Sequence, residues 1–151
     1  MPGLYGMKSL WWLTEIEVVS DDDSGYYERK GRSEEAIVKT MSRIDLPGHG
    51  EGIRGQEYLV RGLALAGTRE IPKVQVNTDE GLSWQEIQLD PPLSQYAWMF
   101  WRYRWMIPGP GSYALRVRAM DGTGRWQSEL EQEPAPDGAA GLHEVTVTVT
   151  G

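Results

Sequence analysis

The sequence predicts an all-β fold, a sandwich of about seven strands, and three observations lead to this prediction. Apolar and polar residues alternate with a period of two in several segments, as in half-buried strands. Clusters of Gly, Pro and Asp separate these segments at roughly the spacing found in β-sandwiches. No segment has the apolar period of an amphipathic helix. We therefore expect two β layers to enclose the core.

The first third of the chain holds one strand candidate, at residues 10–19. Apolar residues alternate there with glutamates, which predicts a strand. The acidic run at residues 21–25 follows it as a turn. Residues 25–41 are polar and mixed, and the pattern predicts no element for them. The glycine-rich stretch at residues 46–52 is interpreted as a linker or a long loop.

From residue 58 onward the signals favour strands throughout. Gly62, in the first of these strands, indicates a bulge or a point of close approach. The alternation changes parity between Trp84 and Ile87, which indicates a bulge there. The predicted strands are residues 58–66, 74–76, 84–89, 97–107, 113–119 and 145–149.

The strand at residues 97–107 carries large apolar side chains on both faces. A strand exposed on one side is normally apolar on the other side alone. The second face therefore predicts contact with another domain, another chain or a ligand. The alternative interpretation is that all the tryptophans fill a single core. One face holds Trp101, Tyr103, Trp105 and Ile107, and the other holds Trp98, Phe100 and Met106, interrupted by Arg102 and Arg104.

Composition excludes several classes of protein. The 151 residues fit one domain, or one domain with a fragment of a neighbour. A net charge of -7 argues against a nucleic-acid surface, so we expect no nucleic-acid partner. The apolar runs are too short to span a membrane. There is no cysteine, and so no disulfide, thiolate metal ligand or cysteine nucleophile.

The residues form no recognisable catalytic grouping and no metal site. His49 lies in a glycine-rich loop without a second ligand at a suitable spacing. His143 shares the inward parity of the last strand, which is typical of a structural hydrogen-bonding residue. The aspartates at residues 21–23 lack the spacing of a calcium-binding loop. We therefore predict no catalytic residue and no metal ligand in this chain.

Several short segments, in order along the chain, resemble the C-terminal part of the sulfite oxidase family of molybdenum-cofactor oxidoreductases. The first segment resembles the stretch that closes the family's molybdopterin domain, and the others resemble its C-terminal domain. Together they cover nearly the whole chain, and their order is more specific than any one of them. The segments are residues 2–13, 42–47, 73–84, 96–101, 117–127 and 141–149.

The resemblance implies an immunoglobulin-like sandwich at residues 42–151, which the family uses for dimerisation. Residues 1–41 are then a remnant of the molybdopterin-binding domain. The partners implied are a second copy, in a homodimer, and the upstream molybdopterin domain of the parent protein. Members of the family are often exported, which implies a periplasmic or otherwise extracytoplasmic location. The function expected is that of a dimerisation domain fragment, which is not catalytic by itself.

The cofactor implied for the parent protein is molybdopterin, whose molybdenum the family holds through the pterin dithiolene and one cysteine. This chain has no cysteine, so we expect no cofactor in the isolated chain. Lys8, Ser9, Leu10 and Trp11 resemble a cofactor-contacting stretch, in which Lys8 is suited to neutralise the pterin phosphate. The family usually has a lysine where Trp11 stands. The alternative for Lys8 is an ordinary exposed lysine.

The loop before the last strand departs from the family pattern. Some sulfite oxidases supply an anion-binding arginine from this loop. Here residues 133–138 include two carboxylates, and no Arg or Lys follows Arg125. Like charges repel, which argues against a sulfite dianion as the substrate of the parent protein.

A second function from a different class is consistent with the same residues. The chain would then be a free-standing immunoglobulin-like binding module. Its exposed tryptophans and tyrosines would recognise carbohydrate or protein. A molybdopterin domain encoded directly upstream would favour the first function, and a different upstream module would favour the second.

Overall fold

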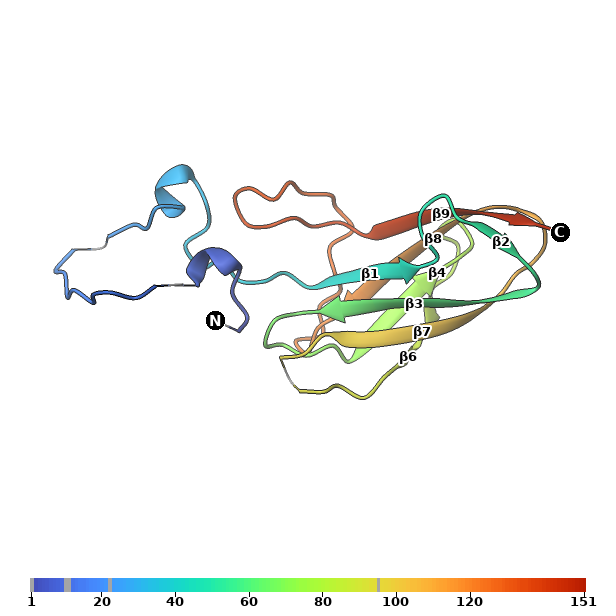
Figure 1. Cartoon of the computed structure of the whole chain (residues 1–151), viewed down its shortest axis with the longest axis horizontal. Helices are drawn as coiled ribbons and strands as arrows, with labels where there is room; N and C mark the ends of the chain where they lie inside the picture. The colour runs from blue at the N-terminus through green and yellow to red at the C-terminus, as the bar shows by residue number, and fades with distance from the viewer. Residues whose placement is uncertain (1, 10–11, 22, 95) are drawn as a thin grey trace.

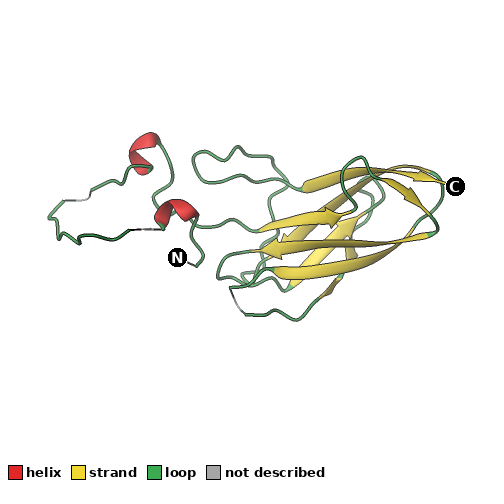
Figure 2. Cartoon of the chain, viewed as in Figure 1, coloured by secondary structure: helices red, strands yellow, loops and turns green. Residues whose placement is uncertain are grey.

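The computed structural model describes residues 2–9, 12–21, 23–94 and 96–151 (Figure 1). Regular structure in these residues is almost entirely β, with nine strands and two short 3₁₀ turns (Figure 2). The turns, η1 (Gly6–Lys8) and η2 (Glu28–Lys30), lie in the N-terminal segment, to one side of the strands.

The strands form two sheets that pack face to face. One sheet has the order β1-β3-β7-β6, and the other has the order β2-β9-β8-β4-β5. Neighbouring strands are antiparallel except β2 and β9, which are parallel. The predicted all-β sandwich, with the layering of an immunoglobulin-like fold, is thus confirmed. In chain order the strands are β1 (Met41–Leu46), β2 (Gly52–Arg54), β3 (Glu57–Leu65), β4 (Lys73–Asn77), β5 (Gln85–Glu86), β6 (Gln88–Leu89), β7 (Met99–Met106), β8 (Gly111–Met120) and β9 (His143–Thr150).

Alternate side chains from both sheets form one core between them. Trp101 and Trp105 of β7 enter it with only 1% and 2% of their surface exposed. The ring of Trp105 meets Tyr113 edge to face, with the ring centroids 5.1 Å apart. Burying rings of this size contributes a large share of the hydrophobic stabilisation. Other buried aliphatic residues in the core are Val60, Val74, Val76, Leu115, Val117 and Val147.

Gly62 is the position where β3 passes closest to Trp101. A Cβ atom at residue 62 would collide with the Trp101 ring and with the backbone oxygen of Arg43. Only a residue without a side chain fits between them. Of the two interpretations of Gly62, close approach is confirmed. A register shift does occur in this ladder, but on β1, between Ile44 and Leu46.

The strand predicted at residues 84–89 divides between the two sheets. β5 pairs with β4 in one sheet, whereas β6 pairs with β7 in the other. Between them Ile87 is buried, and its backbone N–H donates to the carbonyl oxygen of Val74 at 3.1 Å. The parity change therefore marks a change of sheet. This division, together with β1 and β2, which the pattern did not predict, raises the strand number from the six predicted from residue 58 onward to nine.

Two predictions for the first third of the chain are corrected by the structure. The strand predicted at residues 10–19 is wrong for residues 12–19, which are irregular because no described segment pairs with them. Residues 10 and 11 lie outside the described residues. Of the two interpretations of residues 46–52, the linker is wrong and the loop is correct, because this segment connects β1 to β2 within the sandwich. The N–H of Gly50 donates to the carbonyl oxygen of Thr146 at 2.7 Å.

Candidate functional site

The outer side of the four-stranded sheet presents the side chains of β3 and β7 that do not enter the core. Their parity follows from the inward placement of Val60 and Trp101, since successive side chains of a strand point to opposite faces. We define the β3–β7 face by these outward side chains. They pair across the ladder as Glu57 with Met106, Leu59 with Arg104, Arg61 with Arg102 and Leu63 with Phe100.

Large apolar side chains on the β3–β7 face are only half covered. Phe100 and Met106 are 49% and 63% exposed, and Leu59 is 39% exposed. Trp98, just before β7, is 47% exposed. The prediction that this strand carries apolar surface beyond the core is confirmed, and a single core for all the tryptophans is wrong for Trp98. Several exposed large apolar side chains on one sheet face, here interspersed with Arg102 and Arg104, make it a candidate interaction site.

Charged groups on and around the β3–β7 face are unevenly paired. Three arginines have carboxylates nearby, whereas Arg61 has none within ion-pair distance among the described residues. Arg61 also lies directly opposite Arg102, and like charges in that position destabilise a ladder. Both arginines line a pocket of about 380 Å³ that also contacts Phe100. The ion pairs are Arg43–Asp45 at 2.7 Å, Arg102–Asp90 at 2.6 Å and Arg104–Glu57 at 3.4 Å.

The outer side of the five-stranded sheet is different, because its charges find partners within the chain. Arg116 pairs with Glu144 at 2.5 Å across β8 and β9. Lys73 pairs with Glu86 at 3.3 Å across β4 and β5. The outward residues of β9 include threonines, which present no large apolar surface. This side offers little that a partner would complete.

Arg118 is the central group on the outer side of the five-stranded sheet. Its guanidinium lies 4.1 Å from the ring centroid of Trp84 and 4.6 Å from that of Trp126. It donates to Gln75 Oε1 at 2.9 and 3.0 Å, and it pairs with Glu129 at 3.1 Å. A cation between two rings gains electrostatic attraction from both. Sequence reasoning missed this stack, because its members come from three separate segments.

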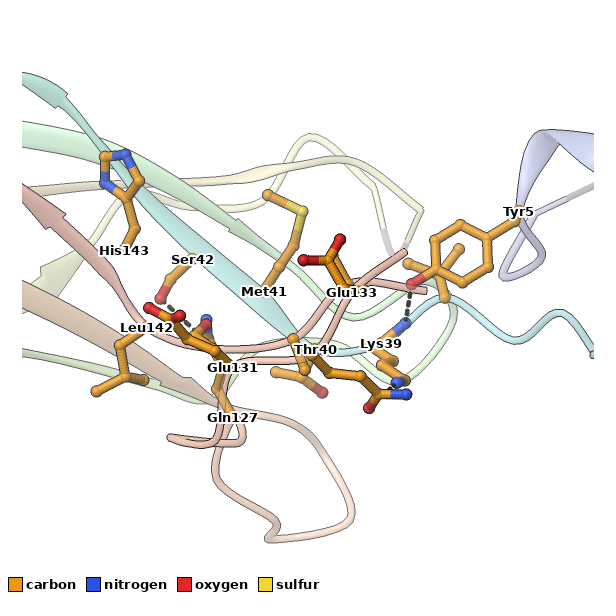
Figure 3. Close-up of a pocket in the computed structure, with 15 residues that line it drawn as sticks. Tyr5, Lys39, Thr40, Met41, Ser42, Gln127, Glu131, Glu133, Leu142 and His143 are labelled. Atoms are coloured by element: carbon orange, nitrogen blue, oxygen red, sulfur yellow. Dashed lines mark hydrogen bonds between the residues drawn. The ribbon is translucent and has the colours of Figure 1, made fainter. Parts of the chain in front are cut away.

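A cavity of about 690 Å³ lies beside the start of β1, between the N-terminal segment and the loop before β9. Figure 3 shows Tyr5 at one end of it and His143 at the other. Polar groups of its wall mostly bind one another. Ser42 Oγ donates to Gln127 Oε1 at 2.6 Å, and Gln127 Nε2 donates to the Gly141 carbonyl at 2.8 Å. This wall is therefore a structural network.

His143 joins the two sheets at the edge of β1. Its Nδ1 accepts a hydrogen bond from the backbone N–H of Ile44 at 3.1 Å. Burial lowers the pKa of His143, and the positive charge of Arg43 lowers it further. The neutral ring is the form that accepts this bond. The prediction of a structural hydrogen-bonding histidine is confirmed. His49 has a similar role, since its Nδ1 accepts from the N–H of Thr146 at 3.3 Å.

A lobe at residues 131–141 fastens the N-terminal segment to the sandwich. Lys39 Nζ donates to Gln132 Oε1 at 2.8 Å and to the Gly138 carbonyl at 2.9 Å. Arg32 donates to the Pro134 carbonyl at 2.6 Å. The acidic loop singled out in the sequence thus contacts the N-terminal segment.

Asp121 anchors the same junction from the end of β8. Its carboxylate accepts hydrogen bonds from Arg69 Nε and Thr40 Oγ1, both at 2.9 Å, and from Thr123 Oγ1 at 2.6 Å. Burial alone would raise the pKa of Asp121, but these donors together hold it well below its usual range. Arg69 also donates to the Val38 carbonyl at 2.8 Å. The charged carboxylate therefore holds the residues that lead into β1 in place.

The predicted cofactor contacts lie in and after η1. Lys8 ends this turn, and its ammonium pairs with the carboxylate of Glu28. The hydrogen bond from Lys8 lowers the pKa of Glu28. Ser9 follows, and its backbone N–H donates to the Gly6 carbonyl at 2.9 Å. Leu10 and Trp11 lie outside the described residues. In this arrangement the charge of Lys8 is balanced by Glu28.

Within the described ranges, no three His, Asp or Glu side chains gather closely enough to hold a metal ion. None of the helical turns in those ranges has the length and apolar character needed to cross a membrane.

The chain matches a family of Mo-co oxidoreductase domains and is similar in sequence to sulfite oxidases. Residues 34–133 match the family described as Mo-co oxidoreductase dimerisation domain. Mitochondrial sulfite oxidase of Rattus norvegicus is 27% identical over 130 residues, which are 72% of this chain and 24% of that protein. The Homo sapiens enzyme is 27% identical over 144 residues, 80% of this chain and 26% of that protein.

A more distant relative and one solved structure agree with these matches. Nitrate reductase [NADH] of Hordeum vulgare is 27% identical over 165 positions, covering 85% of this chain and 18% of that protein. Sulfane dehydrogenase SoxCD from Paracoccus pantotrophus has the same fold, with a TM-score of 0.56 at 22% identity. That match covers 72% of this chain and 30% of the other.

The chain spans about a quarter of the length of the sulfite oxidases it matches. The family match covers most of the sandwich, including β3, β7 and the exposed apolar surface between them. This protein therefore belongs to the Mo-co oxidoreductase dimerisation domain family.

Proposed function

We propose that this chain holds two copies of a sulfite oxidase-like molybdopterin oxidoreductase together through the β3–β7 face, and that it contributes no catalytic group of its own. One observation carries the choice of surface. Phe100 and Met106 are 49% and 63% exposed, although Trp101 and Trp105, their neighbours along β7, point into the core and are buried.

Pairing through this face is favoured by the apolar area that it would bury. Each half-exposed side chain of this size contributes on the order of 1 kcal/mol when its remaining surface leaves water. In a twofold contact each side chain counts twice, because both copies bring the same patch. Specific interfaces bury about 800 Å² on each partner, which is the area this contact would have to cover.

The strand edges are less suitable than the face. β5 and β6 have two residues each, and β2 has three, so they give few backbone hydrogen bonds. β1 is longer, but the Ile44 N–H is already taken by His143. An edge blocked by a side chain does not extend a sheet into a second copy. Face-to-face packing of the two sheets is therefore the arrangement we propose.

We also propose that residues 1–41 belong to the neighbouring molybdopterin domain of the parent protein and residues 42–151 to the dimerisation domain. Trp12, Ile16 and Val18 are 87%, 79% and 96% exposed, although their pattern is that of a half-buried strand. A sheet of the adjacent domain would cover them. The cofactor would bind in that domain, where it supplies the redox chemistry. The contacts predicted for Lys8, Ser9, Leu10 and Trp11 stay a prediction.

The alternative function, a free-standing module that binds carbohydrate or protein, is less well supported. The family match and the sulfite oxidase relatives both favour the dimerisation domain. The tryptophans of the outer five-stranded side are already stacked on Arg118.

The test is the oligomeric state of the full chain, measured by sedimentation velocity over a range of concentrations. We expect a dimer, and we expect Phe100→Asp to shift it to a monomer. At a dilution where both chains are monomeric, their melting temperatures should agree. Thr148→Asp, on the outer side of the five-stranded sheet, is the matched control and should still dimerise. A wild-type chain that stays monomeric at high concentration would contradict the proposal, as would a dimer that Phe100→Asp leaves intact.

A further inference from the structure

We infer that two copies pair through reciprocal ion pairs, in which Arg61 of each copy meets Glu57 of the other about a twofold axis near Leu59. The inference rests on the proposed function and specifies its partner, a second copy in a defined orientation. It follows from the charges of the β3–β7 face, the strength with which each is held, and the symmetry of a self-complementary contact.

Among the described residues, Arg61 is the cation on this face with no carboxylate within ion-pair distance. It lies at the centre of β3, opposite Arg102, and Arg102 already binds Asp90 at 2.6 Å. Arg61 and Arg102 both line a pocket of about 380 Å³. Asp45 and Asp90 line it too, each already paired with an arginine other than Arg61. An arginine placed against a like charge gains from an added carboxylate, since that anion relieves the repulsion and accepts its donors.

Of the carboxylates around this face, Glu57 is the one most free to exchange partners. The described candidates are Asp45, Asp90 and Glu57. Asp45 lies 2.7 Å from Arg43, and Asp90 lies 2.6 Å from Arg102. Glu57 is 3.4 Å from Arg104, and the side chains of this pair are 56% and 73% exposed. An exposed ion pair at this distance contributes little, so Glu57 can bind elsewhere at small cost.

The spacing of Glu57 and Arg61 suits a twofold contact. They lie on the same face of β3, two residues to either side of Leu59, and are therefore about 13 Å apart. In an isologous contact, residue i meets residue j and residue j meets residue i. An axis at Leu59 that reverses the strand direction brings Glu57 of each copy to Arg61 of the other. Leu59, 39% exposed, then meets its own equivalent at the centre.

The other aligned arrangement is electrostatically worse. If the two β3 strands ran parallel, each residue would face its own equivalent, with Arg61 on Arg61 and Glu57 on Glu57. Sheets in aligned face-to-face packing keep their strands within about 30° of each other, so these are the two aligned orientations to compare. In the reversed arrangement Arg104, opposite Leu59 in the ladder, also approaches its equivalent. Both Glu57 carboxylates lie beside it there and offset the repulsion.

Charge reversal tests the reciprocal pairing. Arg61→Glu alone places a second carboxylate near Glu57 of the other copy, and Glu57→Arg alone places two arginines together. We expect each variant to weaken the dimer about tenfold or more, and the double variant to recover most of this loss. Mixing the two single variants is the sharper experiment, because both contacts of the mixed dimer are then complementary. Native mass spectrometry with one variant isotopically labelled should show the mixed dimer in excess.

Arg116→Glu mixed with Glu144→Arg is the matched control, because this ion pair lies on the other sheet. These variants should give a statistical mixture. Circular dichroism of each variant checks that it folds. If the wild type dimerises and Phe100→Asp disrupts it, but the mixed charge variants show no preference, the reciprocal pairing is wrong and the interface stands. If Phe100→Asp has no effect, the proposed interface itself fails, and this inference with it.

Discussion

The two outer faces of the sandwich carry the same kinds of side chain but differ in whether these side chains have partners within the chain. On the five-stranded side, Arg118 is held between Trp84 and Trp126 and by Gln75, all in one chain. On the β3–β7 face, Arg61 has no carboxylate within ion-pair distance among the described residues, and Phe100 is 49% exposed. Both sides carry arginines and large rings, so composition does not separate them. The difference lies in whether each group finds its partner within the chain.

Side chains whose hydrogen bonds, charges and apolar surface are already paired within the chain gain little from contact with a second molecule. Contact with a partner would force the Trp84–Arg118–Trp126 stack to rearrange, whereas Phe100 and Arg61 gain from any matching apolar or acidic group. The interaction surface of this protein is therefore the face with unsatisfied groups. The predictions below follow from this difference, beginning with the strongest effect.

The largest effect should separate the two faces of β7 itself. Trp105→Ala removes a ring that is 2% exposed and leaves a cavity, so we expect a loss of about 3–5 kcal/mol in the free energy of unfolding. Phe100→Ala, on the outer side, should change it by less than about 1 kcal/mol. Urea unfolding, followed by circular dichroism at a concentration where both chains are monomeric, measures the two values. Similar losses for both would contradict the two-faced strand.

A smaller effect should distinguish the two central arginines. Arg118→Met removes two hydrogen bonds to Gln75 and two ring contacts, so we expect a loss of about 1–2 kcal/mol in stability and no change in the dimer dissociation constant. Arg61→Met should do the reverse, with stability within about 0.5 kcal/mol and a weaker dimer. Thermal unfolding and sedimentation equilibrium test the pair. A weaker dimer from Arg118→Met would indicate an interface on the five-stranded sheet and would contradict the proposed one.

The smallest effect concerns pH at the seam between the sheets. Burial lowers the pKa of His143 in the folded chain below its ordinary value, so the unfolded chain takes up the proton first as the pH falls. The contribution of neutral His143 to the free energy of unfolding is complete above about pH 6.5. It is lost as the pH falls from there through the lowered pKa, by at most about 1.4 kcal/mol per pH unit.

His143→Gln is the control for this pH dependence, because an amide oxygen can accept the Ile44 N–H without titrating. The variant should unfold at a urea midpoint that changes less between about pH 7 and about pH 5 than that of the wild type. An unchanged slope would show that another group is responsible.

Much of the fold could be predicted from the sequence, because alternation within a strand is a local property. Six predicted segments correspond to strands, and the inward parity of Trp101 and Trp105 is correct. The errors come from positions where the neighbour decides. Residues 12–19 alternate like a strand, but no described segment pairs with them. β1 and β2 carry weak patterns, and their pairing with β3 and β9 makes them strands.

The candidate interface could be predicted only in outline. The sequence placed Trp98, Phe100 and Met106 on a second face that exceeds the needs of one core, which the structure confirms. Nothing in the sequence showed that Arg61 would lie opposite Arg102, because that depends on the register between β3 and β7, about forty residues apart. The sequence places two carboxylates at residues 133–138, but it does not show that Lys39 and Arg32 hold this loop in position.

By itself the sequence determined that this protein is a β-sandwich with one strand too apolar for a single core, because side-chain alternation fixes the faces of each strand before any strand meets another. Only the tertiary structure decided which outward groups are satisfied. Arg118 has two rings and an amide around it, and Arg61 has another arginine opposite, although both occupy central strands. Long-range register sets these neighbours, and an electrostatic interaction depends on neighbours and their distances more than on residue type.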